Sequence, residues 1–395
     1  MTVADRPTWA PSDRPAAVLE GLAGRVPPRR VPNAELPASW GVDDAWVRRR
    51  TGIVTRHWAG PGVRTSDLAF EAAHRVLAAL DGPEPDTVLV ATSTPDRPIP
   101  AMAPHLAARL GLGQVAAWDI AAACSGFGYG LAAAAGALAA GYARRVLLVA
   151  AEVYSTLLDP ADRGAGVVFA DGAGAVLLRR GTHGEPGSLL AFDLGSDGTG
   201  HELIQVPGGG AAERARPARH TPADRYFRMA GREVYRHAVT RMTESSQRVL
   251  ARTGWTADDV DRFAAHQANA RILDTVGERL RLPGDRQVSN IDRVGNTGAA
   301  SLPLALADAA SRGQLVAGAR VLLTSFGAGL TWASATLCWP DLPAVAPVAD
   351  TITPEADTAT CTGIDAATDA STDARIDAAV DAGIDTATPA TAARR

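Results

Sequence analysis

Short runs of apolar residues recur along the chain and predict buried strands. The clearest runs cover residues 87–92, 146–150, 174–178, 260–265 and 321–324. Amphipathic or alanine-rich stretches of helical length lie between them. Strands that alternate with helices in this way predict a layered α/β fold.

The same order of elements occurs twice. The first copy has a strand, then a loop that leads into a helix at Cys124, and then a further strand. The second copy has a strand, then a loop at Asn296, and then a further strand. The spacing within the two copies is similar. The pattern therefore predicts two related halves, which we place at residues 31–190 and 191–347.

The two ends of the chain differ from this body. Residues 1–30 are rich in proline and arginine, which predicts a partly loose leader with ordered structure from about Ala16. Residues 348–395 consist largely of Ala, Thr and Asp without an aromatic residue, so we expect a disordered acidic tail. From Asp365 to Asp385 an aspartate stands at every fourth position, which opposes a helix because like charges would share one face. An acidic docking tail and a dispensable extension both remain open.

The charge balance argues against a nucleic-acid partner. All 39 basic residues are arginine, and the formal net charge is −4. Most of the negative charge lies in residues 351–395, so the main body is nearly neutral. A protein that binds nucleic acid would show a basic excess in its body.

Cysteine content and the uncharged segments indicate a cytoplasmic protein without a membrane span. The three cysteines are too few and too scattered for a disulfide scaffold or a metal cluster, and the first 15 residues lack the apolar core of a signal peptide. Residues 120–143 carry no charge and are long enough to cross a bilayer. They are mostly Ala and Gly, which favours a turn followed by a tightly packed interior helix.

The strongest chemical signal is Cys124, in the stretch DIAAACSGFGYG at residues 119–130. A cysteine at a strand-to-helix turn lies where backbone N–H groups and the helix dipole favour the thiolate, and this predicts a lowered thiol pKa. The small flanking residues leave room for a substrate. A lone cysteine that serves only as a small buried apolar residue is the alternative.

Two further stretches carry polar side chains at helix starts. His266 follows an apolar strand in FAAHQANA, and Asn296 lies in GNTGAAS. Taken alone, His266 would be a buried core histidine and Asn296 a helix N-cap.

Together these three stretches resemble the β-ketoacyl-ACP synthase III family of the thiolase superfamily, over about residues 30–340. The matching motifs stand in family order and lie at residues 46–53 (WVRRRTGI), 92–96 (TSTPD), 162–174 (DRGAGVVFADGAG), 266–269 (HQAN), 295–298 (GNTG) and 325–332 (SFGAGLTW). The resemblance implies a thiolase-like fold with layers in the order α-β-α-β-α.

The resemblance also implies a reaction. Cys124 attacks an acyl-CoA thioester and forms an acyl-enzyme. His266 and Asn296 then donate hydrogen bonds to the thioester oxygen of malonyl-ACP, which stabilises the enolate left when carbon dioxide departs. The enolate attacks the acyl-cysteine, whose oxyanion lies between the backbone N–H groups of Cys124 and Ala328. Acyl-CoA and malonyl-ACP are substrates, and neither a cofactor nor a metal is implied.

Binding roles follow from the same motifs. Trp46 and Arg163 match positions on the two faces of the CoA adenine, and Arg50 lies near the phosphates. Asn269 matches a pantetheine contact. Arg271 matches a basic residue that contacts the acidic acyl carrier protein.

Two apolar positions complete the implied site. Phe326 is expected beside the site of decarboxylation, with plain core packing as the alternative. Ile99 matches a residue that closes the acyl pocket of the partner in a homodimer, or it is merely interface core.

Related functions differ in particular residues. A thiolase needs a second reactive cysteine where this chain has Ser325, a hydroxymethylglutaryl-CoA synthase needs a glutamate that these motifs lack, and a non-catalytic partner subunit would be expected to lose Cys124. An acyltransferase that does not condense remains an alternative, although Asn296 favours decarboxylative condensation. Fatty-acid and polyketide starter synthesis both remain open.

Overall fold

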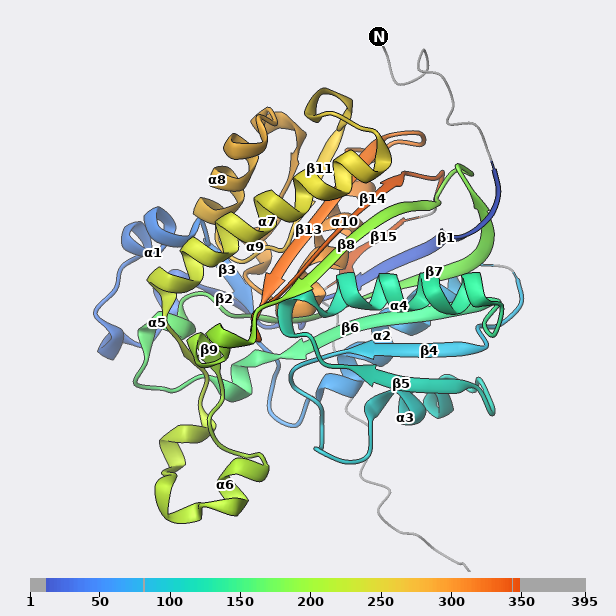
Figure 1. Cartoon of the computed structure of the whole chain (residues 1–395). Coiled ribbons are helices and arrows are strands. Elements are labelled where there is room, and N and C mark those ends of the chain that lie inside the picture. Colours follow the sequence, from blue (N-terminus) through green and yellow to red (C-terminus); the bar gives the residue numbers. More distant parts are fainter. Residues whose placement is uncertain (1–11, 81, 343, 349–395) are drawn as a thin grey trace, which may run out of the picture. The chain divides into compact units, whose positions relative to one another are not determined.

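The computed structural model describes residues 12–80, 82–342 and 344–348 (Figure 1). One sheet has six strands in the order β15-β1-β7-β6-β4-β5. Strands β4, β5 and β6 run parallel, and β7 is antiparallel to both β6 and β1. The bounds are β1 Ser12–Arg25, β4 Thr87–Ala91, β5 Ala116–Ile120, β6 Arg145–Val153, β7 Asp171–His183 and β15 Ala344–Val348.

The second sheet repeats this plan with five strands in the order β12-β11-β13-β14-β8. Strands β11, β12 and β13 run parallel, and β14 is antiparallel to both β13 and β8. The predicted pair of related halves is therefore confirmed, because β5-β4-β6-β7-β1 and β12-β11-β13-β14-β8 have the same order and directions. The bounds are β8 Leu189–Ser196, β11 Arg262–Ala265, β12 Gln287–Val288, β13 Arg320–Gly327 and β14 Thr331–Cys338.

Helices cover both sheets and also lie between them (Figure 1). Side chains of α4 and α10 share one apolar cluster with both sheets. Helices α2 and α3 pack on the outer face of the first sheet, and α7 and α8 pack on the outer face of the second. The layers follow the predicted order α-β-α-β-α. The bounds are α2 Thr65–Ala78, α3 Met102–Arg109, α4 Gly126–Ala140, α7 Gly231–Thr253, α8 Ala270–Leu280 and α10 Ser301–Ser311.

Small residues let α4 lie close to both sheets. A Cβ added to Gly130 would come within 2.5 Å of Leu148, and one added to Gly128 within 2.6 Å of Ala333. Half of the uncharged span Ala123–Ala140 is buried inside the protein, although its length and composition would allow it to cross a membrane. The uncharged segment is therefore an interior helix, as its Ala and Gly content predicts.

Short elements complete the described fold. Near the site described below lie the antiparallel strand pair β2-β3 and helices α1, α5 and α9. Helix α6 belongs to a segment that projects from the body (Figure 1). The bounds are β2 Arg30–Pro32, α1 Asp44–Thr51, β3 Thr55–His57, α5 Arg163–Gly166, β9 Ile204–Gln205, α6 Ala211–Ala215, β10 Arg228–Met229 and α9 Ile291–Val294.

The predicted start of the first half at residue 31 is wrong, because the ordered structure expected from about Ala16 is strand β1, which belongs to the first sheet. Strand β1 lies between β7 and β15, and its side chains are buried from Ala16 onward. Leu22 is 1% exposed. The first half therefore includes β1, ahead of residue 31, and β15, the last described strand, joins the same sheet. The expected acidic tail, apart from its first residue Val348, lies outside the described residues.

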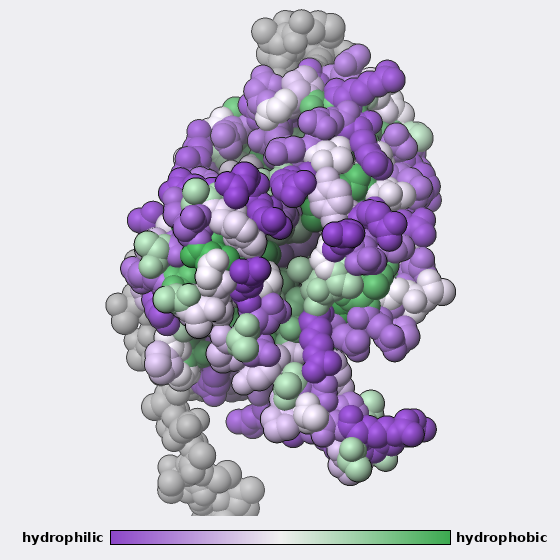
Figure 2. Space-filling view, turned by 90° about the vertical axis from the view of Figure 1, so that its left-hand side faces the viewer, coloured by the Kyte–Doolittle hydropathy of each residue, from purple (hydrophilic) through white to green (hydrophobic). Residues whose placement is uncertain are grey.

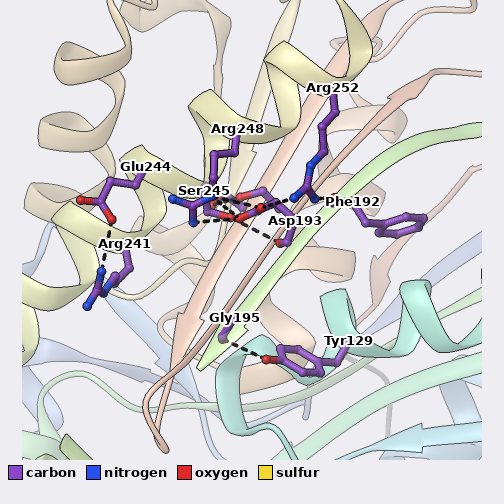
Figure 3. Close-up of polar contacts among 11 residues, drawn as sticks. Tyr129, Phe192, Asp193, Gly195, Arg241, Glu244, Ser245, Arg248 and Arg252 are labelled. Carbon is purple, nitrogen blue, oxygen red and sulfur yellow. Dashed lines mark hydrogen bonds and ion pairs between the residues drawn. The ribbon is translucent and has the colours of Figure 1, made fainter. Parts of the chain in front are cut away.

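Polar contacts fix the edge strand β8 to helices on its two sides (Figure 3). The buried Asp193 carboxylate accepts hydrogen bonds from Arg248 at 2.9 and 3.1 Å and forms an ion pair with Arg252 at 3.2 Å, both from α7. From α4, the Tyr129 hydroxyl donates to the Gly195 carbonyl at 2.9 Å. The Tyr129 contact joins the central helix of the first half to the second sheet, and the Asp193 contacts hold β8 to α7 within the second half.

The interior position of β1 can be tested with a matched pair of leucines. Leu22→Ala should lower the free energy of unfolding by about 2–5 kcal/mol, because it removes a buried side chain from the core. Leu194 on β8 is 41% exposed, so Leu194→Ala should cost clearly less. Urea unfolding followed by circular dichroism measures both. Equal losses in the two variants would show that β1 is not part of the core.

Candidate active site

Cys124 lies in a tight turn between β5 and α4. The turn is the 3-10 segment Ala123–Ser125, and α4 begins directly after it at Gly126. Ala123 has a φ of 45°, in the left-handed region that costs energy for a residue with a Cβ. The surrounding contacts therefore hold the turn in a conformation that the chain would not adopt by itself.

The β13–β14 turn of the second half presses against this turn. A Cβ added to Gly327 would lie 2.7 Å from the backbone nitrogen of Cys124, so only glycine fits there. The Ser125 hydroxyl donates to the Thr331 carbonyl at 3.0 Å, and the Thr331 hydroxyl donates to the Ala122 carbonyl at 3.1 Å. The two halves thus meet backbone to backbone at the cysteine.

His266 follows the end of β11 and is 2% exposed. Its Nδ1 lies 2.6 Å from the Ser301 hydroxyl oxygen, which also accepts the backbone N–H of Gln267 at 3.2 Å. When the Ser301 hydroxyl donates its own proton to Nδ1, the imidazole proton lies on Nε2. Burial lowers the pKa of His266 to about 4, so the ring is neutral at neutral pH.

Asn296 occupies the position in the second half that Cys124 has in the first, in the loop that leads into the central helix. Its backbone pairs with the first half, since its N–H donates to the Val168 carbonyl at 3.1 Å and its carbonyl accepts from Ala170 at 2.8 Å. Its side-chain Oδ1 accepts the Gly298 N–H at 2.9 Å. The amide oxygen is therefore engaged inside the loop, and the Nδ2 group is left to donate.

One cavity of about 550 Å³ joins these elements. Among the residues that the structure describes, its mouth carries four arginines, and no aspartate or glutamate lines it. Figure 2 shows this face with hydrophilic side chains gathered around a hollow and hydrophobic ones inside it. The sequence-predicted residues on its wall are Trp46, Arg50, Cys124, His266, Asn269, Arg271, Asn296, Phe326 and Ala328, and the remaining arginines of the mouth are Arg232 and Arg236.

The enclosed position of Cys124 changes the expected electrostatics. Burial, and next the negative charge of Glu152, raise the pKa of the thiol to about 12. The predicted lowering by the helix start is therefore wrong for the free thiol. Hydrogen bonds from the Tyr154 side chain and from the backbone of Cys124 itself act in the opposite direction and favour the thiolate.

The predicted nucleotide-binding residues gather at the cavity mouth. The guanidinium carbons of Arg50 and Arg163 lie 4.7 and 5.5 Å from the ring centre of Trp46. Arg163 therefore lies beside Trp46 although it does not line the cavity itself. An adenine can enter between these two side chains only if Arg163 turns aside.

Asn269 and Arg271 lie at the start of α8. Asn269 caps this helix by accepting the Arg271 N–H at 2.9 Å, and its Nδ2 donates to the Arg50 carbonyl at 3.0 Å. Each end of the amide keeps one further hydrogen-bonding position for a ligand. Arg271 itself is exposed.

Ile99 is the predicted site residue that the structure keeps away from the cavity. It is 85% exposed. The structure also adds residues that the sequence analysis missed. Ser301 stands in the quoted GNTGAAS motif, five positions after Asn296, and that closeness was the available signal. Tyr154 had none, because it stands outside the quoted motifs and reaches the cavity wall only in the folded chain. Among the described residues, no group of three His, Cys, Asp or Glu side chains is placed to hold a metal ion.

A pair of glycine substitutions tests the close contact at Cys124. Gly327→Ala should push the two turns apart and lower the rate of the condensation that the sequence resemblance implies by about 100-fold, the scale of losing one oxyanion donor. Gly136→Ala, on an exposed part of α4 where nothing lies within 4 Å of the new Cβ, should leave turnover intact and add about 1 kcal/mol of stability. Full turnover in Gly327→Ala would contradict this role of the contact.

Comparison with known proteins is consistent with this geometry. The family model described as 3-oxoacyl-[acyl-carrier-protein] synthase III matches residues 118–198, and the model of its C-terminal part matches residues 250–339. The chain is 54% identical over 330 residues to β-ketoacyl-[acyl-carrier-protein] synthase III 5 of Streptomyces coelicolor, which covers 84% of this chain and 99% of that protein. The corresponding Pseudomonas aeruginosa synthase is 48% identical over 83% of this chain and 98% of its own length.

Solved structures agree. The crystal structure of 3-oxoacyl-(acyl carrier protein) synthase III, FabH, from Pseudomonas aeruginosa PAO1 matches with a TM-score of 0.77 and 47% identity, over 83% of this chain and 99% of that one. The priming β-ketosynthase from the R1128 polyketide pathway matches with a TM-score of 0.77 and 32% identity, over 85% and 100%. The fold is thus that of these condensing enzymes, and the chain belongs to the β-ketoacyl-[acyl-carrier-protein] synthase III family.

Proposed function

We propose that this chain condenses an acyl-CoA starter with malonyl-ACP, with loss of carbon dioxide, to begin a fatty-acid or polyketide chain. The main support is that one cavity with a basic mouth is lined by Cys124, His266, Asn296 and the Gly327–Ala328 turn. The relatives of this chain include β-ketoacyl-[acyl-carrier-protein] synthases III and the priming β-ketosynthase of a polyketide pathway, and they support both alternatives.

In the first half-reaction, Cys124 Sγ attacks the acyl thioester. The Sγ–acyl bond forms, the bond from the acyl carbon to the CoA sulfur breaks, and CoA leaves as a thiolate that takes up a proton. We assign the oxyanion that develops on the acyl carbon to the backbone N–H groups of Cys124 and Ala328. The close contact between Gly327 and the Cys124 nitrogen supports this assignment, because it brings the two turns together.

In the second half-reaction, His266 and Asn296 act as hydrogen-bond donors rather than as bases. The neutral ring of His266 offers Nε2–H, and Asn296 offers its amide Nδ2. Both would bind the thioester oxygen of malonyl-ACP and stabilise the enolate that forms when the carboxylate is lost. The enolate carbon then attacks the acyl carbon, the bond from that carbon to Sγ breaks, and the released Cys124 thiolate takes up a proton from solvent.

The cavity mouth suits anionic substrates. Arg50, Arg232, Arg236 and Arg271 are exposed there, with the indole of Trp46 next to Arg50. This set offers contacts to the phosphates and adenine of CoA and to an acidic carrier protein, and Asn269 offers its remaining amide positions to pantetheine. Both substrates bring their own reactive thioester, so the proposal needs no bound cofactor. We place the enzyme in the cytoplasm, where these substrates are made.

A second copy of the chain would complete the enzyme. Strand β5 lies at the edge of the first sheet, and its side chains Trp118 and Ile120 are only partly buried. An open strand edge with apolar side chains is a surface that pairs with another chain. Ile99 is exposed in the loop after β4, the neighbouring strand. A two-fold dimer through β5 would cover both features and bring Ile99 to the partner's acyl pocket.

The two half-reactions should separate in Asn296→Ala. Acylation of Cys124 by acetyl-CoA should remain within about threefold of wild type, because Asn296 acts only on malonyl-ACP. Condensation should fall by about 100-fold with the loss of one donor to the enolate. Intact-protein mass spectrometry measures the first step and β-ketoacyl-ACP formation the second. Condensation at the wild-type rate in Asn296→Ala would contradict the role of Asn296 as a donor to the enolate, whereas wild-type enzyme that is acylated but forms no β-ketoacyl-ACP would favour an acyltransferase that does not condense.

The dimer predicts a particle of about twice the chain's 40.8 kDa in light scattering. Ile99→Phe should keep this mass and shift the preference toward shorter acyl-CoA substrates, because the larger side chain would fill part of the partner's pocket. Competition between acetyl-CoA and butyryl-CoA measures the shift. A fully active monomer would contradict the proposal.

A further inference from the structure

The α6 segment, residues 206–227, leaves the body at the cavity wall and returns to it there (Figure 1). At its base β9 pairs antiparallel with β10, and Ile204 of β9 and Met229 of β10 both line the cavity. Beyond this strand pair, the Gly208 N–H donates to the Asp224 carbonyl at 2.7 Å and closes the neck of the segment. A partner bound to the α6 segment therefore lies beside the mouth of the cavity.

The two acidic residues of the α6 segment each have an arginine partner. Glu213 forms an ion pair with Arg225 at 3.0 Å. Asp224 accepts the Thr221 N–H at 2.7 Å and forms an ion pair with Arg228 of β10, also at 2.7 Å. Both carboxylates are thus neutralised inside the segment or at its base.

Three further arginines of the α6 segment are left for a partner. Arg214, Arg216 and Arg219 are exposed, and none of them forms an ion pair with an acidic side chain among the described residues. They also stand outside the cavity wall, so a ligand inside the cavity does not account for them. Where the chain re-enters the body, Arg232 and Arg236 line the mouth. The basic surface of the mouth therefore continues onto the α6 segment.

We propose that the α6 segment is a second docking surface for the carrier protein, in which Arg214, Arg216 and Arg219 bind acidic side chains of malonyl-ACP while its malonyl group enters the cavity. The inference rests on the proposed function, because it takes malonyl-ACP as the second substrate. It adds a separate surface to Arg271 at the mouth, the residue that the sequence resemblance assigned to this partner.

The position of the three arginines calls for a large partner. CoA can be held at the mouth, whereas a ligand that reaches both the mouth and the projecting segment must be a macromolecule. The acidic carrier protein meets this condition, because its malonyl group enters the cavity while its own surface stays outside. Opposite charges across such an interface speed association and favour the right partner.

Nucleic acid and membrane fit this surface less well. The main body of the chain is nearly neutral, whereas a nucleic-acid-binding protein carries a strong basic excess. A segment that binds a membrane surface carries bulky apolar side chains beside its basic ones. Among the described residues, the exposed large hydrophobic side chains all lie outside the α6 segment.

Replacing Arg214, Arg216 and Arg219 together by alanine tests the proposal. The KM for malonyl-ACP should rise about 10-fold at about 50 mM salt, because three exposed charge pairs are lost. The difference should shrink to about twofold at about 0.5 M salt, where charges are screened over a few ångströms. Both kcat and the acylation of Cys124 by acetyl-CoA should stay within about twofold, since the three residues stand outside the cavity wall.

Binding can also be measured without turnover. The probe is a purified bacterial acyl carrier protein that lacks its phosphopantetheine, and biolayer interferometry gives its Kd. The alanine variant should raise this Kd about 10-fold at low salt. Lysine at the same three positions keeps the charges and should bring the Kd back to within about threefold of wild type.

A matched variant removes the same charge elsewhere. Arg144, Arg180 and Arg312 are exposed and stand at or next to those ends of β6, β7 and α10 that are remote from the cavity. Replacing these three by alanine should leave the KM for malonyl-ACP and the Kd within about twofold of wild type, because no partner is expected there.

An unchanged KM and Kd in the folded alanine variant at Arg214, Arg216 and Arg219 would overturn the proposal, as would equal losses in the two triple variants. A DNA duplex or vesicles of anionic phospholipid that bind through these three arginines more tightly than the carrier protein does would overturn it as well. Failure of the proposed function is a different result, in which wild-type enzyme forms no β-ketoacyl-ACP whatever its affinity for the carrier protein.

Discussion

The contact between the backbone of Gly327 and the amide of Cys124 is the constraint on which the site depends. No side chain fits between these two turns, and each turn belongs to a different half of the chain. The contact sets the distance between the halves at the nucleophile. It is possible only because the central helix α4 lies close to both sheets through its glycines, and because Ser125 and Thr331 tie the turns together.

Duplication explains why the reactive groups meet. Cys124 and Asn296 precede the central helices α4 and α10 at equivalent points of the two halves, and the backbone of Asn296 pairs with the loop before β7 in the first half. The loops that lead into these two helices therefore converge on one place. The enclosed cavity keeps His266 neutral and holds the cysteine mainly as a thiol. Such a site relies on fixed hydrogen-bond donors, which are more effective where water is excluded.

The sequence predicted the layers, the two halves and nine residues of the cavity wall, because apolar runs and short motifs are local features. It failed where the outcome depends on distant partners. The proline and arginine in residues 1–30 concealed the apolar positions of β1, whose place in the sheet depends on β7 and β15. The helix start at Cys124 suggested a lowered thiol pKa, yet enclosure and the distant Glu152 decide its direction. Tyr154 could not be found for the same reason, since it lines the cavity with Cys124 but follows a different strand of the first sheet.

The central claim is that the acyl group passes through Cys124 on its way to the new carbon–carbon bond. A single turnover with carbon-14-labelled acetyl-CoA, quenched at intervals, tests it directly by following the label on isolated peptides and on the carrier protein. The account predicts that the label appears first on the peptide containing Cys124. After malonyl-ACP is added, it should leave that peptide at the rate at which labelled β-ketoacyl-ACP forms. Label that reaches the product without first residing on Cys124, or that resides on another peptide, would contradict the account.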